Sequence, residues 1–578
     1  MVLSLVAPLS SFVAERVHGV ALGYTDVTVT EAKVMIDTNP FLVLLDVRNQ
    51  SEYDAGHIRN ARLIPVWEFA ARLNELNKTD EILVYCMAGG RSANASQTLA
   101  DSGFLHVYNM LGGITDWTGK GYPVYVKYPL IQEAINNTTD GGIVYVSSGL
   151  YNEYLFVNRS IALVGENGPT TILNGTSTIL NVNVDNVQIS DFTIRHIGCA
   201  CYGYSAVNIT NSQDTNVTNN IIVSDDFGIR VVNARRVIIA QNTIAHTGDP
   251  SIVVLDSSEI SVLGNSIEAS DGIEVDTTTE SIFSRNAILS SRGAGIFTYA
   301  SNENTFSSNN VSVNSSTAIS IAGSHNNTFF GNNVSSNGPY RLFSWQSSNN
   351  SFFHNNFLGT TGQVSNYDST NFWDNGFEGN FWSSYTGVDA DPDGLGDTPF
   401  VIDSTSASAR TNKDNCPLMG LFHSFDTTLD YDVDIVSNST ISGFEYLGSN
   451  RTIKLQVSNT TANQTIGFCR ISIPHSLIDP INGSISAVID DGLTPILFLN
   501  STLYDNGTHR WIYFTYPHST HEILIVPEFP IIVMLPLFMI AGVIATATCK
   551  RRRRARSLKT NQRSREIGNL CVVLFTLK

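Results

Sequence analysis

The pattern of hydrophobic and polar positions changes three times along the chain. In residues 24–126, short apolar runs alternate with stretches of helical periodicity. The runs 41–46 and 82–86 are continuous and rich in Leu, Val and Ile, which is typical of strands buried on both faces. Helical periodicity follows at 92–102. Strands that alternate with helices predict an α/β domain with a parallel sheet.

From about residue 128 a repeat replaces this alternation. Short β-type runs of Ile, Val, Ser and Thr are punctuated by Asn at steps of 21 to 24 residues. The marks are Asn220, Asn242, Asn265, Asn286, Asn310, Asn333 and Asn356. Helical repeats need longer periods, and leucine-rich repeats would show a regular Leu pattern. The period therefore predicts a parallel β-helix over 128–425, with coils about 4.8 Å apart.

Three further expectations concern the β-helix. An inward Asn at each turn can hydrogen-bond to its copies in the coils above and below, so we expect an Asn ladder. The amphipathic run 130–137 predicts a helix that caps the first coil. Asp225, Asp226 and Asp271 precede recurrent Gly-Ile pairs, so we interpret them as repeat positions facing solvent rather than as a catalytic carboxylate pair.

Residues 426–525 contain short alternating segments separated by Gly, Asn and Pro turns. This spacing predicts a β-sandwich, and the segments carry no residues arranged for catalysis. We interpret the domain as a stalk.

An apolar run of membrane length follows. Residues 529–549 contain no charge and predict a transmembrane helix. A basic cluster begins at Lys550, so the positive-inside rule puts the tail 550–578 in the cytoplasm and the bulk of the chain outside the cell. Twelve or more Asn-x-Ser/Thr sequons agree with an exported glycoprotein. Residues 1–23 are apolar but lack a basic start, which indicates an incomplete signal segment.

Composition excludes several classes. With 42% hydrophobic and 15% charged residues, the chain is neither disordered nor a polytopic membrane protein. The net charge is −18, and ten of the basic residues lie from Lys550 onward, so the remaining body is too acidic to favour nucleic acid. Seven scattered Cys do not form a disulfide framework. We expect Cys199 and Cys201 not to bridge each other, and Cys86 to stay free.

Cys86 ends a predicted buried strand, and a glycine-containing loop follows it. The loop residues are Met87, Ala88, Gly89, Gly90 and Arg91, and Ser92 opens the next helix. N–H groups of such a loop, together with a helix N-terminus and a nearby guanidinium, lower the pKa of a thiol and stabilise a thiolate or persulfide. A lone Cys at a strand end is more often an inert core residue.

Several motifs accompany Cys86 in order: Asp46-Val47-Arg48, Glu52-Tyr53, Gly56-His57-Ile58, the Cys86 loop, and Gly112-Gly113-Ile114 with Trp117. Together they resemble the rhodanese family over the whole module 24–126. The resemblance implies a sulfurtransferase in which Cys86 takes sulfane sulfur and Arg91 helps to hold the anionic donor. It also implies that Asp46 and Arg48 pair beneath the site, with His57 in a supporting role.

Two other resemblances concern the rest of the chain. The run 130–137, the Asn repeats and Gly379-Asn380-Phe381-Trp382 resemble the NosD-like right-handed β-helix proteins, a family associated with carbohydrate and, in its namesake, with copper delivery. Clustered soft copper ligands are lacking in this sequence. Pro527-Glu528-Phe529-Pro530, the apolar run and the basic cluster resemble the PEF-type C-terminal sorting signals of archaeal surface proteins.

A candidate cation site lies near the end of the repeats. Asp389, Asp391, Asp393 and Asp397 alternate with other residues around a glycine turn, and the carbonyl of Leu395 is a further candidate ligand. Hard oxygens at this spacing favour Ca²⁺, although position 400 is Phe and not the Glu of an EF-hand. An Asp-rich turn is the alternative. Nearby Trp373, Trp382 and Tyr385 are expected to cap the β-helix core rather than to stack on sugar.

The sequence as a whole predicts a cell-surface sulfurtransferase anchored in the membrane, with a β-helix that binds envelope or glycan. Its partners would be a donor such as thiosulfate or a persulfide, and a thiol acceptor. No cofactor is expected for sulfur transfer, apart from Ca²⁺ at 389–397. Two alternatives stay open: a non-catalytic adhesion or carbohydrate-binding protein with a vestigial rhodanese, and a β-helix polysaccharide hydrolase or lyase.

Overall fold

The structure is a computed structural model. It describes residues 23–198, 203–245, 247–359, 363–402, 412–461, 463–479, 485–490, 496–498, 502–517 and 519–527. Residues 1–22, the predicted membrane helix 529–549, the tail 550–578 and the 199–201 cysteine pair lie outside this part. Among the described residues, no helix is both long enough and apolar enough to cross a membrane.

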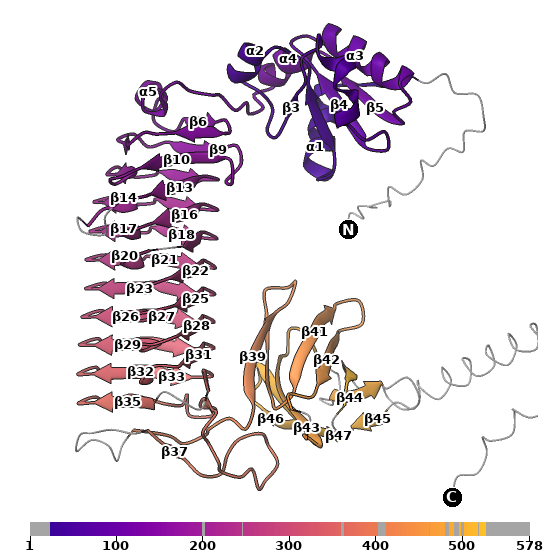
Figure 1. The fold of residues 1–578 in the computed structure, drawn as a ribbon. Helices are drawn as coiled ribbons and strands as arrows, with labels where there is room; N and C mark the ends of the chain where they lie inside the picture. Colours follow the sequence, from indigo (N-terminus) through magenta and orange to yellow (C-terminus); the bar gives the residue numbers. More distant parts are fainter. Residues whose placement is uncertain are drawn as a thin grey trace, which may run out of the picture. The chain divides into compact units, whose positions relative to one another are not determined.

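The described residues of Met1–Asp391 and Leu395–Phe422 form one compact unit, and those of Pro392–Gly394 and His423–Lys578 form a second. Within the first unit, the N-terminal module is an α/β domain, as predicted (Figure 1). Its elements are β1 (Thr25–Val27), α1 (Val29–Thr38), β2 (Val43–Asp46), α2 (Gln50–Asp54), β3 (Arg62–Leu63), η1 (Phe69–Ala71), η2 (Leu73–Glu75), β4 (Glu81–Tyr85), α3 (Gly90–Asp101), β5 (His106–Met110) and α4 (Gly113–Gly119).

The five strands of this module form one parallel sheet in the order β1-β5-β4-β2-β3. The central strand β4 is buried on both faces. Ile82 and Val84 enter one hydrophobic core, whereas Leu83 and Tyr85 enter the other. This two-sided burial is the reason for the continuous apolar run in the sequence.

The elements from Ile131 to Trp382 form a parallel β-helix with a cap at its N-terminal end. The short helix α5 (Ile131–Asn137) precedes the first coil, and its Ile131 and Ile135 are fully buried in the β-helix core, as predicted for a cap. Three parallel sheets follow. We name each by its first and last strand in the sequence.

The β7–β36 sheet contains β7 (Gly149–Tyr151), β10 (Thr171–Gly175), β13 (Thr193–His196), β16 (Ile221–Ser224), β19 (Thr243–Ala245), β22 (Ser266–Ala269), β25 (Ala287–Ser290), β28 (Asn310–Val313), β31 (Asn333–Ser336), β34 (Asn356–Leu358) and β36 (Phe381–Trp382). The β8–β35 sheet contains β8 (Leu155–Val157), β11 (Leu180–Val182), β14 (Ser205–Thr210), β17 (Phe227–Val232), β20 (Pro250–Leu255), β23 (Asp271–Asp276), β26 (Ile296–Tyr299), β29 (Ile319–Ala322), β32 (Tyr340–Trp345) and β35 (Gln363–Tyr367). The β6–β33 sheet contains β6 (Ile143–Val146), β9 (Ala162–Gly165), β12 (Gln188–Ser190), β15 (Asn216–Thr218), β18 (Ile238–Ala240), β21 (Ser261–Leu263), β24 (Ile282–Ser284), β27 (Thr305–Ser307), β30 (Thr328–Phe330) and β33 (Ser351–Phe353).

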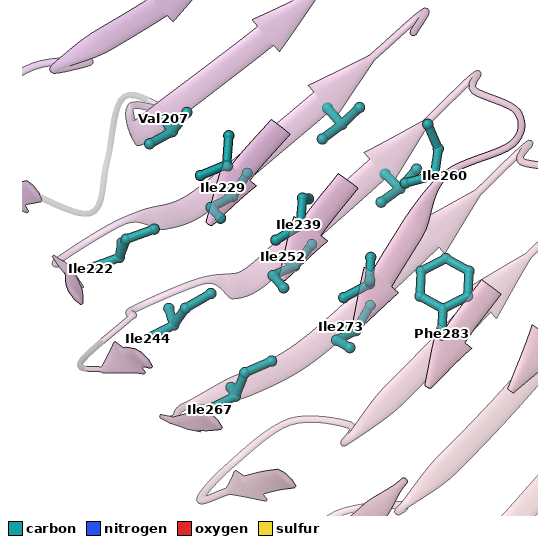
Figure 2. Close-up of a cluster of buried hydrophobic side chains, with 14 of the residues drawn as sticks. Val207, Ile222, Ile229, Ile239, Ile244, Ile252, Ile260, Ile267, Ile273 and Phe283 are labelled. Atoms are coloured by element: carbon teal, nitrogen blue, oxygen red, sulfur yellow. The ribbon is translucent and has the colours of Figure 1, made fainter. Parts of the chain in front are cut away.

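The interior of the β-helix is filled by columns of aliphatic side chains. Val207, Ile229, Ile252 and Ile273 pair from coil to coil in the β8–β35 sheet and all point inward (Figure 2). A column of aromatic rings continues the core at its C-terminal end, where Phe352 stacks on Trp373 at 4.5 Å between centroids. Trp373 and Trp382 are both 1% exposed, which confirms that they cap the core.

The predicted Asn ladder exists, but its register differs in three coils. The ladder consists of Asn220, Asn242, Asn265, Asn286, Asn309, Asn332, Asn355 and Asn380. The prediction of Asn310, Asn333 and Asn356 was wrong, because the inward residue is the first Asn of each Asn-Asn pair. The residue before it has positive φ (54° at Ser308), and this turn rotates the following side chain into the core.

The second unit carries two antiparallel sheets, ordered β39-β40-β43-β47-β46 and β41-β42-β48-β44-β45. Ile471 of the first sheet and Ile453 of the second belong to one shared hydrophobic core, as expected for a β-sandwich. The strands are β39 (Leu421–Asp426), β40 (Asp432–Ser437), β41 (Thr440–Leu447), β42 (Thr452–Ser458), β43 (Ile466–Pro474), β44 (Ile485–Asp490), β45 (Ile496–Phe498), β46 (Thr502–Asp505), β47 (His509–Pro517) and β48 (His521–Pro527). A small pair, β37 (Phe400–Val401) and β38 (Lys413–Asp414), precedes them in the first unit.

Candidate active site

Cys86 lies at the carboxyl end of the central strand of the N-terminal module. β4 ends at Tyr85, and a tight loop leads from Cys86 to the start of α3. Gly89 precedes α3 with a φ of 96°, a conformation that residues with a Cβ rarely adopt. The turn brings the N–H of Gly89 back to the Cys86 sulfur, which accepts its hydrogen bond at 3.2 Å.

The Cys86 side chain is 1% exposed, and hydrogen-bond donors surround its sulfur. The Ser92 hydroxyl donates to Sγ at 3.5 Å. Burial raises the pKa of the Cys86 thiol, whereas the hydrogen bond from the Ser92 hydroxyl and those from the backbone N–H groups of Ser92, Ala88 and Gly89 lower it. The net pKa lies below the ordinary value of a thiol, so the site favours a thiolate.

A glycine at the start of α4 fixes the backbone behind the thiol. Gly113 has a φ of 56°, and a Cβ at this position would lie 2.4 Å from the carbonyl oxygen of Cys86. The N–H of Ile114 donates to that carbonyl at 2.9 Å, and the N–H of Thr115 donates to the carbonyl of Met87 at 3.1 Å. The start of α4, which lies far from the loop in the sequence, therefore holds the loop in one conformation.

Arg91 is oriented by an acidic partner. Its two terminal nitrogens donate to the two carboxylate oxygens of Glu52, at 2.8 and 2.6 Å. The hydrogen bond from Arg91 lowers the pKa of Glu52 to about 2. The same hydrogen bond raises the pKa of Arg91, and the negative charge of the Cys86 thiolate adds to this. Arg91 thus lies within electrostatic reach of Cys86. The Glu52-Tyr53 motif in the sequence does not by itself indicate this role of Glu52.

Beneath the site, Asp46 and Arg48 form a buried ion pair at 2.6 Å, which confirms the predicted pairing. The Arg48 guanidinium also donates to the carbonyl of Gly56 at 2.7 Å, so it joins the strand β2 to the segment after α2. A cavity of about 420 Å³ opens beside the loop, and its lining includes Arg48, Glu52 and Met87.

The ring nitrogens of His57 have partners outside the Cys86 loop. Its Nε2 lies 2.9 Å from Oε1 of Glu166, which directly follows strand β9 in the second coil of the β-helix, and its Nδ1 lies 2.9 Å from the carbonyl of Tyr53. The imidazole also stacks on the Tyr53 ring at 3.6 Å between centroids. His57 therefore joins two modules of the first unit and does not contribute to the Cys86 environment. No sequence signal identifies Glu166 as its partner, because 109 positions separate the two residues.

Comparisons with known proteins agree with this geometry. A family model described as a rhodanese-like domain matches residues 28–120. The sulfurtransferase of Allochromatium vinosum is 33% identical over 90 residues, which are 16% of this chain and 83% of that protein. The chain belongs to the rhodanese family. A second family model, described as the periplasmic copper-binding protein NosD, matches residues 135–296 and 205–387, so the rhodanese-like domain is fused to a NosD-like β-helix.

Two other known proteins are similar to part of this chain. The protein YrkF of Bacillus subtilis is 40% identical over 95 residues, which are 16% of this chain and 51% of that protein. The chain thus spans about half the length of this curated relative. A solved rhodanese-related protein from Thermoplasma volcanium is 31% identical and matches 18% of this chain and 100% of its own, with a TM-score of 0.17.

The name of the NosD family raises the question of copper. Copper sites use thiolate, thioether and imidazole ligands. Within the part of the chain that the structure describes, the cluster of three or more His, Cys, Asp or Glu side chains consists of Asp389, Asp391 and Asp393, which are all hard carboxylates. His354 is already paired with Glu378 at 2.8 Å. These described residues do not fit copper.

The carboxylates at the Gly-Ile positions of the β-helix differ from expectation. Asp226 is fully buried and not solvent-facing, so the prediction was wrong for this residue. Its carboxylate accepts hydrogen bonds from the N–H of Tyr204 at 2.8 Å and from its neighbour Phe227 at 3.2 Å. A buried turn must satisfy its N–H groups, and here a side chain does so. Asp225 and Asp271 are half-buried.

Asp249 lies beside Asp226, and the pH dependence of stability tests this arrangement. Burial, and then the hydrogen bond with Asp226, raise the pKa of Asp249 to about 6. Since the folded chain binds this proton more tightly than the unfolded chain, stability is lost as pH rises from about 4 to about 6. Asp249→Asn should therefore raise the free energy of unfolding at pH 7.5 by about 1 kcal/mol after allowance for solvent screening. The gain should be much smaller at pH 4.5 than at pH 7.5 in thermal melts; an equal gain at both pH values would contradict the assignment.

The predicted cation loop brings three of its carboxylates together. One oxygen from each of Asp389, Asp391 and Asp393 lies within 4.8 Å of the others. Asp397 is not part of this cluster. Its carboxylate accepts a hydrogen bond from the N–H of Ala390 at 2.6 Å and so closes the turn. The Leu395 side chain is half-buried.

Proposed function

We propose that the rhodanese-like domain is an active sulfurtransferase with Cys86 as its nucleophile. The observation that carries the proposal is the Cys86 sulfur held among N–H and O–H donors at the end of β4. The thiolate attacks the sulfane sulfur of a donor such as thiosulfate. The sulfur–sulfur bond of the donor breaks, and sulfite leaves with the electron pair. A persulfide anion remains on Cys86, stabilised by the same donors.

The second half of the reaction restores the enzyme. A thiolate acceptor attacks the terminal sulfur of the persulfide, the bond to Cys86 breaks, and the Cys86 thiolate is regenerated. We assign to Arg91 the attraction of the anionic donor and to Glu52 the orientation of Arg91. Asp46 and Arg48 position the backbone, and His57 has a structural role. The cavity beside Met87 offers room for the donor or the acceptor.

The direct test is sulfur transfer from thiosulfate to cyanide by the whole chain, followed as thiocyanate. Turnover supports the sulfurtransferase. A folded chain with no turnover and no persulfide would favour the alternative of an adhesion protein with a vestigial rhodanese. The polysaccharide hydrolase or lyase has weaker support, because the buried Asp226 already accepts two backbone hydrogen bonds.

We propose that the β-helix binds glycan or envelope at the cell surface and that residues 529–549 anchor the chain, with the tail 550–578 in the cytoplasm. This proposal is based on the charge pattern, the sequons and the resemblance to PEF-type sorting signals of archaeal surface proteins. Protease treatment of intact membrane vesicles tests the orientation. The tail should be protected, and the part of the chain outside should be digested.

We propose Ca²⁺ as the ligand of Asp389, Asp391 and Asp393, with Asp397 and the carbonyl of Leu395 as further ligands. A cation bound only to the folded chain stabilises it by about 2.7 kcal/mol at a hundredfold excess over Kd. The chain should therefore melt at a higher temperature in millimolar Ca²⁺ than in chelator.

A matched pair of variants tests this calcium site. Asp391→Ala should erase the response to Ca²⁺, because Asp391 is exposed and contributes a carboxylate to the cluster. Glu268→Ala removes an exposed carboxylate of the β-helix and should leave the response unchanged. A wild-type melting temperature that ignores Ca²⁺ would show that the loop is an acidic turn.

A further inference from the structure

An exposed group of aromatic side chains lies on the outer face of the β8–β35 sheet. The three most exposed are Tyr299 (49%), Trp345 (39%) and Tyr367 (40%). Phe297 and Phe343 are partly exposed beside them. Within the described part of the chain, no hydrogen bond holds the Tyr299 hydroxyl or the Trp345 indole N–H. We call these five residues the aromatic strip. Large rings left in water in one contiguous place indicate a binding surface.

The register of the strands arranges the aromatic strip in two columns. In one column the residues in register over four successive coils are Phe297, Ser320, Phe343 and Ser365, of which Ser365 is buried. In the other they are Tyr299, Ala322, Trp345 and Tyr367. Small residues thus separate the rings in both columns from coil to coil. Only the last step, from Trp345 to Tyr367, places two rings in adjacent coils.

The spacing within each column follows from the coil geometry. Two coils separate Phe297 from Phe343, and two separate Tyr299 from Trp345. At about 4.8 Å per coil, the rings of each pair repeat about every 10 Å along the axis. This repeat is close to the length of two sugar units in an extended glycan. A small residue between two rings leaves room for the ring substituents of the intervening sugar.

The charges around the aromatic strip exclude anionic ligands. Glu274 and Asp276 occupy the same two columns one coil earlier, and Asp368 follows Tyr367. The basic residue in strands β23 to β35 of this sheet is Arg341, which is 5% exposed and donates to carbonyls inside the fold. A phosphate or uronate chain would meet carboxylates without a compensating cation. A neutral ligand fits this surface.

We infer that the aromatic strip binds a neutral, extended, β-1,4-linked glycan along the axis of the β-helix. The flat apolar faces of alternate pyranose rings stack on the aromatic rings, and their equatorial hydroxyls point sideways to water and to the partly exposed Ser320 side chain. The inference deepens the glycan-binding role proposed above by naming the surface and the ligand class. It is independent of sulfur transfer at Cys86.

The test is calorimetric titration of the whole chain with cellohexaose and, separately, with chitohexaose. Either ligand should bind, and the affinity should rise from the disaccharide to the tetrasaccharide, because several coils must be spanned. Trp345→Ala and Tyr299→Ala should each lower the affinity about tenfold or more, because each removes one stacking ring. Tyr154→Ala removes an equally exposed aromatic ring (53%) outside the aromatic strip and should bind as the wild type does.

Three results would overturn the inference: no binding of either hexasaccharide, an equal loss in Tyr154→Ala, or equal binding of polygalacturonate, which carries a carboxylate on each sugar. Sulfur transfer measured on the same variants separates the two proposals. Loss of glycan binding with full turnover concerns the aromatic strip alone, and loss of turnover with full glycan binding concerns Cys86 alone.

Discussion

Cys86→Ser is expected to lower sulfur transfer from thiosulfate to cyanide by a factor of about 10³ or more, because the hydroxyl is not ionised at neutral pH and cannot hold a persulfide. The volumes of the two side chains are close, so the domain should stay folded. After incubation with thiosulfate, the wild type should gain the mass of one sulfur atom at Cys86 and the variant should not. Wild-type turnover in a folded Cys86→Ser protein would contradict the proposed mechanism.

Ser92→Ala provides a graded companion to this experiment. It removes the hydroxyl donor to the Cys86 sulfur but leaves the nucleophile in place. Because that hydrogen bond lowers the pKa of the Cys86 thiol, the variant should show a higher thiol pKa. The pH dependence of Cys86 alkylation by iodoacetamide measures it. A profile identical to that of the wild type would show that the Ser92 hydroxyl does not stabilise the thiolate.

Asn309→Leu is expected to destabilise the β-helix by roughly 4 kcal/mol. Asn309 is fully buried, and its amide donates to the carbonyl of Phe283 at 2.8 Å and to the side chain of Asn332 at 3.0 Å. Its carbonyl oxygen accepts from the N–H and the amide of Asn286, both at 3.0 Å. Leucine has a similar size but leaves these buried groups without partners, at about 1–3 kcal/mol each.

Asn310→Leu is the matched control for this prediction. Asn310 is the next residue, it has the same chemistry, and its side chain is exposed on the outer face of β28. Its replacement should change stability by about 0.5 kcal/mol or less. Urea denaturation and limited proteolysis of both variants measure the difference. Equal effects in the two variants would contradict the register of the ladder.

The sequence predicted the architecture well, for reasons that particular elements make clear. The alternation around 82–86 identified a two-sided parallel sheet, because a strand buried on both faces needs a continuous apolar run. The Asn period identified the β-helix, because every coil must repeat the same buried hydrogen bond. The loop from Cys86 to Ser92 identified the candidate nucleophile, since its glycines and the following helix are local features.

Other features required the tertiary structure. The sequence could not choose between Asn309 and Asn310, because both have the same chemistry and only the positive φ of Ser308 turns one of them inward. Asp226 looked like a surface residue until its backbone partners in a neighbouring coil were visible.

The site shows the same division between local and long-range information. The sequence by itself determined the candidate nucleophile, its loop and the parallel β-helix, because the chemistry and the repeat lie in residues close together along the chain. Only the tertiary structure decided that Glu52 orients Arg91, that Glu166 pairs with His57, and that rings from separate coils form the aromatic strip. These contacts join residues far apart in sequence, and no local pattern specifies which distant side chain completes a pair.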